Sequence, residues 1–288
     1  MKERISIIIP TLNRPAQLIK LLEKIIHFDD EDEIIVVDDS MESLNKAIEA
    51  NFGKKIKYKN RGKRLGVSSA RNLGAELATS NYLLFLDDDD DFTDSWLNSF
   101  RSHIQKTPDL IFCNMISVEP NGKRHYVSTS DNSLGAMGDR IVIPGAWMVR
   151  RDFFLNLNGY DERLLFAENT EFFYRAFSEK PKVSYISEFN FIYHPCPTGG
   201  SKNLQNMVDS LSIILEKHSA SLNDHVKHLY HQIIGVNHLR FRDFRKAQTH
   251  LWKAVKFKPS KPSTWGRWGI SLFPFIARGL YSETVDHG

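Results

Sequence analysis

The sequence predicts an α/β protein with a mostly parallel sheet, and three neighbouring segments carry this prediction. Residues 5–9 and 34–37 are short runs of mainly β-branched residues, which favour buried strands. The segment between them has apolar residues at the spacing of one helical face: Leu18, Leu21, Leu22, Ile25 and Ile26. A strand, a helix and a second strand in this order form a right-handed βαβ unit, whose two strands are parallel.

Length and composition are ordinary for a globular protein and name no partner. The 288 residues allow one large or two ordinary domains, and the net charge is +3 with 25% charged residues. Cys113 lies in an apolar run and Cys196 between two prolines, which predicts neither a disulfide framework nor a zinc site. The chain shows no signal-peptide core and no apolar stretch of about 18 residues. We therefore expect a cytoplasmic protein.

The acidic run that follows residues 82–86 is the strongest functional signal. Five apolar residues lead directly into five aspartates, Asp87 to Asp91, and ligands of open α/β sheets bind at the carboxyl ends of the strands. In an extended segment Asp87 and Asp89 share one side. Such a D-x-D pair can hold Mg²⁺ or Mn²⁺ together with substrate phosphates and water.

The same run also has a structural interpretation. The aspartates could be solvated turn residues, with Thr93 or Asp94 capping a helix over residues 95–105. Capping requires one or two acids, whereas five are present. The number of carboxylates therefore favours a cation site.

Polar residues also follow the first two predicted strands. Thr11 follows the first strand, and Asp38 and Asp39 follow the second. Because parallel strands end at the same edge of a sheet, we expect these side chains to converge with the later aspartates. Asn13 is suited to cap the intervening helix, with Pro15 in its first turn.

A basic, glycine-containing loop precedes the next predicted helix. Residues 60–72 include Gly66 and Arg71. Free amides at a helix N-terminus attract anions, and an arginine offers two parallel donors to a phosphate. The loop is therefore a candidate diphosphate cradle, and a solvated basic loop is the alternative.

The middle of the chain predicts further strands and a helix that carries acids. Residues 110–127 are typical of a hairpin with its turn at 121–122, residues 129–140 of a loop able to move over a site, and residues 141–149 of an interrupted strand. Phe173, Ala176 and Phe177 form an apolar face at helical spacing. This face leaves Glu168 near the N-terminus of the helix, where it is free to face a site.

The C-terminal region changes to helices from about residue 204. One apolar stripe is expected at Leu211, Ile214 and Leu215, and another at Leu229, Ile233 and Val236. Residues 239–281 contain ten Lys and Arg against one acid, interleaved with aromatic residues. This pattern suits an anionic membrane surface, and a helical subdomain that packs its aromatic residues on the catalytic core is the alternative. No nucleic-acid-binding motif is present, so a nucleic acid partner is not expected.

Five motifs together resemble the family 2 inverting nucleotide-sugar glycosyltransferases, which have the GT-A fold. They lie in the family's order and spacing across residues 4–200, at 7–14, 36–40, 66–72, 85–90 and 168–171. The resemblance implies a Rossmann-like mixed sheet in a catalytic domain over residues 1–203, followed by a helical region over 204–288.

The resemblance also implies site residues. Pro10, Thr11 and Asp39 would line the nucleoside pocket, and Arg71 would lie near the base and diphosphate. Asp87 and Asp89, with Asp88 as an alternative, would hold ribose and the metal, and His194 would approach the metal or diphosphate. The remaining residues of the expected nucleotide site are Asn13, Arg14, Asp38 and Gly66.

One departure from the family pattern concerns the catalytic base. The family commonly has Glu-Asp at the helix start, whereas this chain has Glu168 and Asn169. An amide does not accept a proton usefully at neutral pH, so the base is expected at Glu168, with Glu171 in reserve. The alternatives are an acid that stabilises the helix dipole and an inactive relative.

The expected activity is transfer of a sugar, with inversion, from a nucleoside-diphosphate donor to a hydroxyl of a glycan or lipid-linked acceptor. The resemblance favours a uridine nucleotide, Mn²⁺ or Mg²⁺ as cofactor, and a role in surface polysaccharide synthesis. A catalytically silent nucleotide-sugar-binding protein and a scaffold that docks a membrane or protein partner are the alternatives. Peripheral association with the inner face of the membrane and formation of a homo-oligomer are left open.

Overall fold

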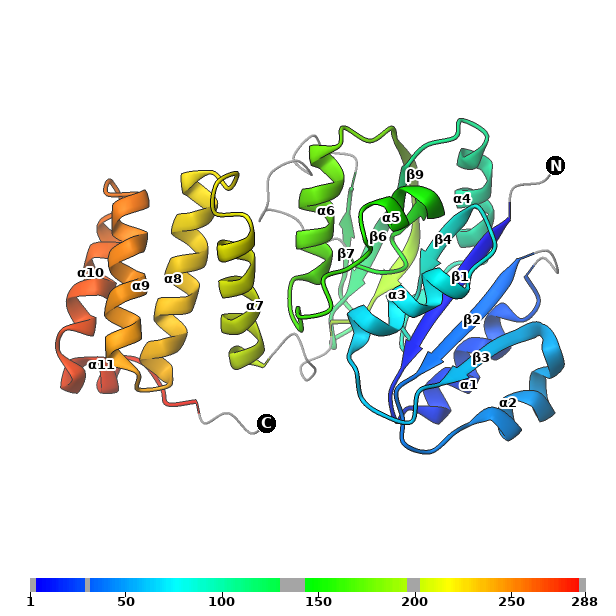
Figure 1. Cartoon of the computed structure of the whole chain (residues 1–288), viewed down its shortest axis with the longest axis horizontal. Coiled ribbons are helices and arrows are strands. Elements are labelled where there is room, and N and C mark those ends of the chain that lie inside the picture. Colours follow the sequence, from blue (N-terminus) through cyan, green and yellow to red (C-terminus); the bar gives the residue numbers. More distant parts are fainter. Residues whose placement is uncertain (1–3, 29–31, 130–142, 196–202, 285–288) are drawn as a thin grey trace. The chain divides into compact units, whose positions relative to one another are not determined.

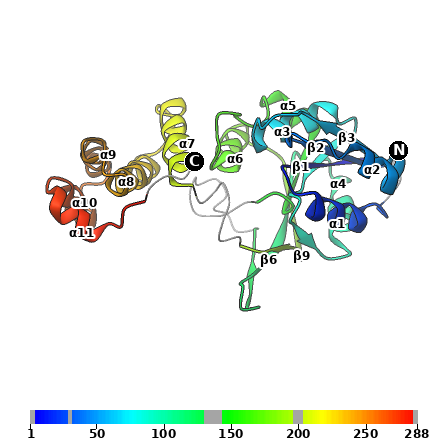
Figure 2. The same cartoon turned by 90° about the horizontal axis from the view of Figure 1, so that it is seen from below.

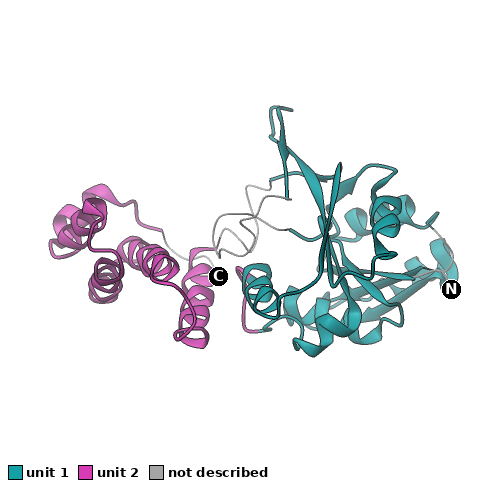
Figure 3. Ribbon diagram, turned by 90° about the horizontal axis from the view of Figure 1, so that it is seen from above, with its two compact units in different colours: residues 1–162, 168–196 teal, residues 163–167, 197–288 magenta. Residues whose placement is uncertain are grey.

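The computed structural model describes residues 4–28, 32–129, 143–195 and 203–284 (Figure 1). The chain divides into two compact units (Figure 3): residues 1–162 with 168–196, and residues 163–167 with 197–288. The second division lies after residue 196, seven residues before the boundary expected at 203. Residues 163–167, which directly precede the helix α6 (Glu168–Ser178), also belong to the second unit.

The first unit contains one mixed sheet in the order β3-β2-β1-β4-β8-β6-β9-β5, with β7 paired to β6. Strands β3, β2, β1 and β4 are parallel to one another, as are β6 and β9, whereas β8, β5 and β7 pair antiparallel. This confirms the predicted mixed, mostly parallel sheet. The strands are β1 (Ile5–Thr11), β2 (Glu33–Asp38), β3 (Ile56–Asn60), β4 (Tyr82–Phe85), β5 (Asp91–Phe92), β6 (Leu110–Val118), β7 (Arg124–Val127), β8 (Trp147–Arg150) and β9 (Val183–Tyr193).

Helices cover both faces of this sheet. Figure 2 shows α1 and α3 on opposite sides of the strands. Because strand side chains alternate, Ile7 and Ile9 of β1 pack with α1, α2 and α4, whereas Ile8 packs with α3, α5 and α6. The helices are α1 (Pro15–Ile25), α2 (Asn45–Phe52), the 3₁₀ turn η1 (Gly53–Lys55), α3 (Val67–Leu77), α4 (Trp96–Ile104), α5 (Arg151–Asn156) and α6 (Glu168–Ser178).

Strand β1 continues through Pro10 to Thr11, although proline was expected to end it. The carbonyl of Ile8 accepts a hydrogen bond from Leu86 N at 3.0 Å, so Ile8 faces β4. Residues two apart in a strand face the same neighbour, and the pairing with β4 stops at Ile8. The missing N–H of Pro10 therefore lies beyond the end of β4, where no ladder hydrogen bond is lost.

The predicted hairpin and the predicted interrupted strand are both present in part. Strands β6 and β7 flank a turn in which Gly122 N donates to Glu119 O at 2.8 Å. Residues 130–142 of the expected loop and strand lie outside the described residues. Gly145 then adopts φ +81°, and Trp96 Nε1 donates to its carbonyl at 2.7 Å before β8 begins.

The second unit consists of helices. They are α7 (Leu204–Lys217), α8 (Asp224–Arg240), α9 (Phe244–Phe257), α10 (Pro262–Ser271) and α11 (Pro274–Leu280). The side chains of Asn203, Asn223 and Asp243 cap α7, α8 and α9 by accepting from the backbone N–H three residues on. No helix in the described ranges is long and apolar enough to cross a membrane.

The apolar stripe predicted for α8 is wrong in part, because Val236 packs on the core of the second unit but Ile233 does not. Ile233 is 36% exposed and Leu229 is half-buried, whereas Val226, Tyr230 and Ile234 are buried. Helix α8 packs against both α7 and α9, so its buried surface is wider than one stripe. Histidine and asparagine occupy part of that surface, which conceals the burial from a hydrophobic pattern.

Candidate functional site

The aspartate run forms a turn at the end of β4. Asp90 N donates to Asp87 O at 3.1 Å, and the Asp90 carboxylate accepts from Asp87 N at 2.7 Å. The predicted extended alternation, with Asp87 and Asp89 on one side, is therefore wrong. A short acidic side chain can bond to a nearby backbone amide and so favours a turn.

Arg14 joins two of the aspartates to the end of β1. Its guanidinium donates to Asp88 Oδ1 at 3.0 Å and to Asp89 Oδ2 at 2.8 Å. Asp88 is buried and also accepts from Thr11 Oγ1 at 2.7 Å. Asn13 does not cap α1, as the sequence predicted. It adopts φ +55° and donates its backbone N–H to Ser40 Oγ at 2.7 Å.

Arg71, on α3, joins the acidic run to α6. Its guanidinium is 2% exposed and donates to Asp87 Oδ1 at 2.6 Å and to Glu168 Oε1 at 3.1 Å. Burial opposes the charge of Arg71, but Asp87, Tyr160 and Glu168 raise its pKa above the usual value. The cation is therefore permanently charged and positions two carboxylates from distant parts of the chain.

Burial raises the pKa of two aspartates in the acidic run. It raises the pKa of Asp88, against the hydrogen bonds from Thr11 and Arg14. Burial and then the charge of Asp87 raise the pKa of Asp90 well above the usual value. Repulsion within the run is thus reduced by two arginines and by the tendency of Asp90 to keep its proton.

The predicted pair after β2 anchors the basic loop. The Asp39 carboxylate accepts from Arg61 Nε at 2.5 Å and from the backbone N–H groups of Leu65 and Gly66, both at 2.9 Å. Asp38 is buried as well, and Tyr58 OH donates to it at 2.5 Å. Asp39 thus fixes the loop that leads into α3, with Gly66 at φ +95° immediately before the helix, whereas Asp38 binds β3.

The two glutamates proposed as a base have different surroundings. Glu168 is the first residue of α6 and accepts from Asn169 Nδ2 at 3.1 Å as well as from Arg71. Asn169 Oδ1 in turn accepts from the Tyr160 hydroxyl at 2.8 Å. Glu171 is fully buried and receives three hydrogen bonds from Arg175.

Glu171 is therefore wrong as a reserve base, because a buried, ion-paired carboxylate does not meet an acceptor hydroxyl. Arg175 also donates to the carbonyls of Leu157 and Gly159. Glu171 thus stabilises the turn after α5. Glu168 is left as the candidate base.

Among the aspartates of the run, His194 acts electrostatically on Asp91. His194 follows β9, which pairs with β5 at Asp91. Burial opposes ionisation of Asp91, but hydrogen bonds from Lys24 and Phe92, with the charges of Lys24 and His194, lower its pKa. The predicted metal-ligand role of His194 gains no contact from the structure.

A divalent cation at this turn would need ligands from the substrate to complete its coordination. Within the described ranges, no three His, Cys, Asp or Glu side chains gather to hold a metal ion by themselves. Mg²⁺ is commonly held by one or two carboxylates, with phosphate and water as the other ligands. Asp87 and Asp89 each share one oxygen with an arginine, and Asp89 is 48% exposed. These two residues would hold the ion together with a diphosphate.

Two residues of this region were missed by the sequence reasoning. Arg61 directly follows β3, so its place at the carboxyl edge of a parallel strand was a usable signal. Tyr160 is buried, and its ring lies 5.7 Å from the Arg71 guanidinium carbon. No local pattern indicates Tyr160, because its partners are distant in the chain.

A family model and several proteins are similar to this chain. The model described as "Glycosyl transferase family 2" matches residues 6–194. An uncharacterized glycosyltransferase of Haemophilus influenzae is 26% identical over 63% of this chain and 64% of its own length. The GalNAc(5)-diNAcBac-PP-undecaprenol beta-1,3-glucosyltransferase of Campylobacter jejuni is 32% identical over 43% of this chain and 42% of its length. The chain thus aligns with less than two thirds of either relative.

A solved structure shares the fold over nearly the whole chain. The crystal structure of S. aureus TarS 1-349 in complex with UDP-GlcNAc covers 96% of this chain and 87% of the TarS chain, with a TM-score of 0.65 and 16% sequence identity. At this identity the likeness concerns the fold.

Proposed function

The chain belongs to glycosyl transferase family 2, and from this membership we propose that it transfers a sugar, with inversion, from a UDP-sugar to a hydroxyl of an acceptor. The observation that carries the proposal is the Arg71 bridge between Asp87 and Glu168. The buried Arg71 guanidinium binds both Asp87, a candidate ligand of the sugar donor, and Glu168, the candidate base. The TarS neighbour binds UDP-GlcNAc, which supports a uridine donor.

In the proposed reaction, the acceptor oxygen attacks the anomeric carbon as the bond from that carbon to the diphosphate oxygen breaks. Glu168 takes the proton of the acceptor hydroxyl, and the electron pair of the broken bond leaves with the nucleoside diphosphate. A single displacement of this kind inverts the anomeric configuration. The hydrogen bonds from Arg71 and Asn169 orient the Glu168 carboxylate before the acceptor arrives.

We assign stabilisation of the negative charge on the leaving diphosphate to residues at the carboxyl ends of β1 and β4. Arg14 is 43% exposed on its side chain and lies beside Asp88 and Asp89, so its guanidinium is accessible to a diphosphate. A Mn²⁺ or Mg²⁺ ion held by Asp87 and Asp89 would supply Lewis-acid stabilisation of the same group. Asp39 and Thr11 would line the nucleoside side of the site, next to the Arg61 loop.

We assign the acceptor to glycans or lipid-linked glycans of surface polysaccharide synthesis. The support is the Campylobacter jejuni relative, whose name describes transfer to an undecaprenol diphosphate-linked glycan. A catalytically silent nucleotide-sugar-binding protein is the second candidate. Asn169, which occupies the place of the expected aspartate, favours that candidate.

The deciding experiment measures nucleotide binding and turnover with the full chain. A thermal-shift series with UDP, other nucleoside diphosphates and Mn²⁺ should show the largest stabilisation with UDP and metal together. Release of UDP from a panel of UDP-sugars should then rise when the matching acceptor is added. Binding of UDP without turnover across the acceptor panel would favour the silent protein. Failure to bind any nucleoside diphosphate would contradict both candidates.

We further propose that residues 272–280 of the second unit bind an anionic lipid surface. In this segment Phe275 is 74% exposed and Leu280 is 63% exposed, and Arg278 lies between them. Residues 239–281 contain ten Lys and Arg but one acid. Exposed aromatic residues among basic residues suit the interface of a membrane with anionic headgroups. The protein would then act peripherally at the inner face of the membrane.

A further inference from the structure

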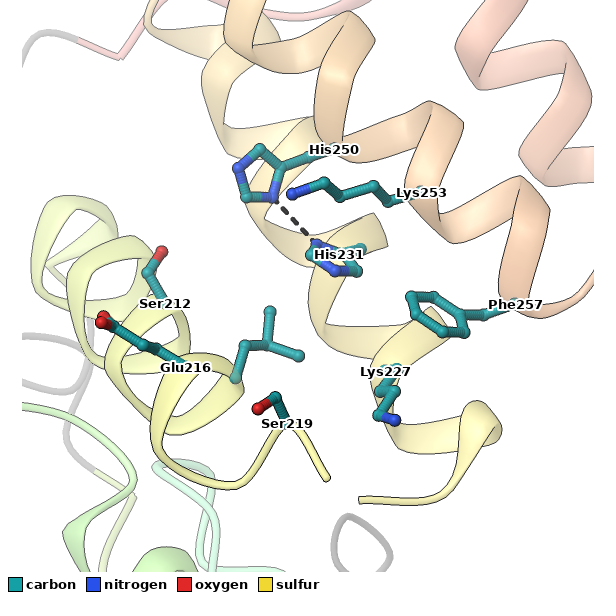
Figure 4. A pocket seen from close by; sticks show the side chains of 9 residues that line it. Ser212, Glu216, Ser219, Lys227, His231, His250, Lys253 and Phe257 are labelled. Carbon is teal, nitrogen blue, oxygen red and sulfur yellow. Dashed lines mark hydrogen bonds between the residues drawn. The ribbon is translucent and has the colours of Figure 1, made fainter. Parts of the chain in front are cut away.

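The second unit contains a cavity that the proposed transfer reaction does not use (Figure 4). Its volume is about 340 Å³, and its walls are side chains of α7 with the turn after it, α8 and α9. Two lysines and two histidines lie in the lining, together with Phe257 and Leu215 as apolar wall. The cavity is therefore cationic on one side and apolar on another.

Helical spacing places a lysine and a histidine on the same face of each helix. Lys227 and His231 are four residues apart on α8, and His250 and Lys253 are three residues apart on α9. Residues at these spacings share a face of a helix. All four residues line the cavity, and Figure 4 shows the two histidines and Lys253 close together, with Lys227 further along α8 beside Phe257.

The two histidines form a direct pair. His231 Nδ1 lies 3.1 Å from His250 Nδ1, so one ring donates a proton that the other accepts. His231 is 8% exposed and stacks on Phe257, with ring centroids 5.7 Å apart. A half-buried polar pair fixed in this way offers its remaining ring nitrogens at constant positions.

Burial, followed by nearby positive charges, lowers the pKa of both histidines. Burial, then His250 and Lys253, lower the pKa of His231 to about 4. Burial, then His238, Lys253 and Lys246, lower the pKa of His250 to about 4. An anion beside Lys253 would offset its charge and allow the histidines to take up protons.

The lysines have little compensation of their own. In the described part of the chain neither Lys227 nor Lys253 forms an ion pair, and the Lys227 ammonium instead lies 5.6 Å from the centroid of the Phe257 ring. Glu216 on α7 is the one carboxylate among the described lining residues. Two ammonium groups attract a dianion such as a phosphate monoester, whose charge is close to −2 at neutral pH, and Glu216 leaves the lining with one net positive charge.

We propose that this cavity binds a phosphate monoester, whose phosphate lies between Lys227, Lys253 and the His231–His250 pair, with its organic part against Phe257. The histidines add donors when they become protonated, so binding is coupled to proton uptake. The site is separate from the donor site and does not depend on the glycosyl-transfer proposal.

The test is calorimetric titration of the full chain with glycerol 3-phosphate, with UDP present at saturation to occupy the donor site. Lys253→Gln should weaken binding about tenfold, because it removes a charge-assisted hydrogen bond. Lys256→Gln is the matched control, since Lys256 is an exposed lysine on the same helix. Equal affinity of the Lys253→Gln variant and the unchanged protein would overturn the proposal, and Lys227→Gln provides a second, independent variant.

Two further arms define the ligand. A phosphodiester such as glycerophosphoglycerol carries one charge and should bind more weakly, and equal or tighter binding would overturn the monoester assignment. The charge of sulfate is constant between pH 8 and pH 5. As the pH falls over that interval, the affinity for sulfate should therefore rise only because the histidines become protonated. A His250→Asn variant should lose that rise, and a rise of the same size would remove the histidine pair from the site.

Discussion

Arg71 determines the geometry of the candidate active site. Its partners Asp87 and Glu168 are 16 and 97 residues away in the chain, and both carboxylates are held on one buried guanidinium. Loss of both carboxylates would leave a buried charge without a partner, which is strongly destabilising. An arginine suits this position because its rigid planar guanidinium presents donors on two nitrogens in fixed directions, one toward each carboxylate.

The role of Glu168 can be tested by the Glu168→Gln variant. The amide keeps the size of the side chain but does not accept the acceptor proton, so kcat should fall by about 10²–10⁴-fold. The Kd for UDP should be unchanged, measured by calorimetry. Glu179→Gln, an exposed residue just after α6, is the control and should retain activity. Full activity of Glu168→Gln would exclude this residue as the base.

Asp89 is the residue at which metal dependence can be tested. Asp89→Asn removes one carboxylate charge from the exposed end of the acidic turn, so the Mn²⁺-dependent gain in UDP affinity should decrease about tenfold or more. Asp91→Asn is a matched control, because Asp91 lies in the same run but pairs with Lys24. Unchanged metal dependence in Asp89→Asn, measured by thermal shift, would refute the assignment of Asp89 as a ligand.

At the scale of elements, Gly145 lies very close to two strands, β4 and β9, near the edge of the sheet that carries the site. The backbone N–H of Gly145 donates to Phe85 O at 2.6 Å, at the end of β4 and directly before the acidic turn. A Cβ at Gly145 would lie 2.0 Å from the Phe191 ring of β9. The turn before β8 therefore requires glycine for its left-handed backbone and for the space beside Phe191.

Gly145→Ala should destabilise the first unit for both reasons. A left-handed alanine costs about 1–2 kcal/mol, and overpacking of the core adds about 1–3 kcal/mol. Gly122→Ala is the matched control, since Gly122 has φ +83° but no heavy atom within 4 Å of the added Cβ. Chemical denaturation should thus show a larger loss of unfolding free energy for Gly145→Ala. Equal losses would mean that Phe191 moves aside without cost.

At the scale of the whole molecule, the two units contain different titrating groups. In the first unit, Glu33 is buried and accepts from Ser6, Lys57 and Thr79. Burial opposes its charge, but these hydrogen bonds lower its pKa well below the usual value. In the second unit the His231–His250 pair has a lowered pKa of about 4. The units should therefore lose stability in different ranges of pH.

The sign of each effect follows from proton binding. Unfolded histidine binds protons below about pH 6.5 while the folded pair resists them, so the second unit should lose stability between about pH 6.5 and 4. The stabilisation from Glu33 is present above its ordinary pKa of 4.5 and is lost as the pH falls below that value. Thermal melts across pH 7 to 3 should show the first loss reduced in His250→Asn and the second in Glu33→Gln. Unaltered profiles would contradict these assignments.

The exposed segment of residues 272–280 gives a prediction for the whole protein. Sedimentation with vesicles should be stronger with anionic than with neutral lipids, and the double variant Phe275→Ser and Leu280→Ser should reduce it several-fold. Met41→Ser is the control, because Met41 is an exposed apolar residue of the first unit. If the double variant sediments like the unchanged protein, the segment is not a lipid contact. A change in its oligomeric state instead would point to a second copy of the chain.

The sequence by itself determined the features that depend on short-range patterns. The parallel strands, the helix after Pro15, the hairpin turn before β7 and the family motifs follow from residues that are neighbours in the chain. The position of Thr11, Asp39 and the acidic run at one sheet edge followed as well, because parallel strands end together.

Only the tertiary structure decided which polar groups meet. The turn of Asp87 to Asp90, the bridge from Arg71 to Glu168 and the burial of Glu171 depend on contacts between distant segments. The buried histidines of α8 are a further case, because a hydrophobic pattern does not reveal polar residues that packing encloses. Short-range periodicity sets the elements, whereas charge pairing and burial are set by elements that approach one another only in the folded chain.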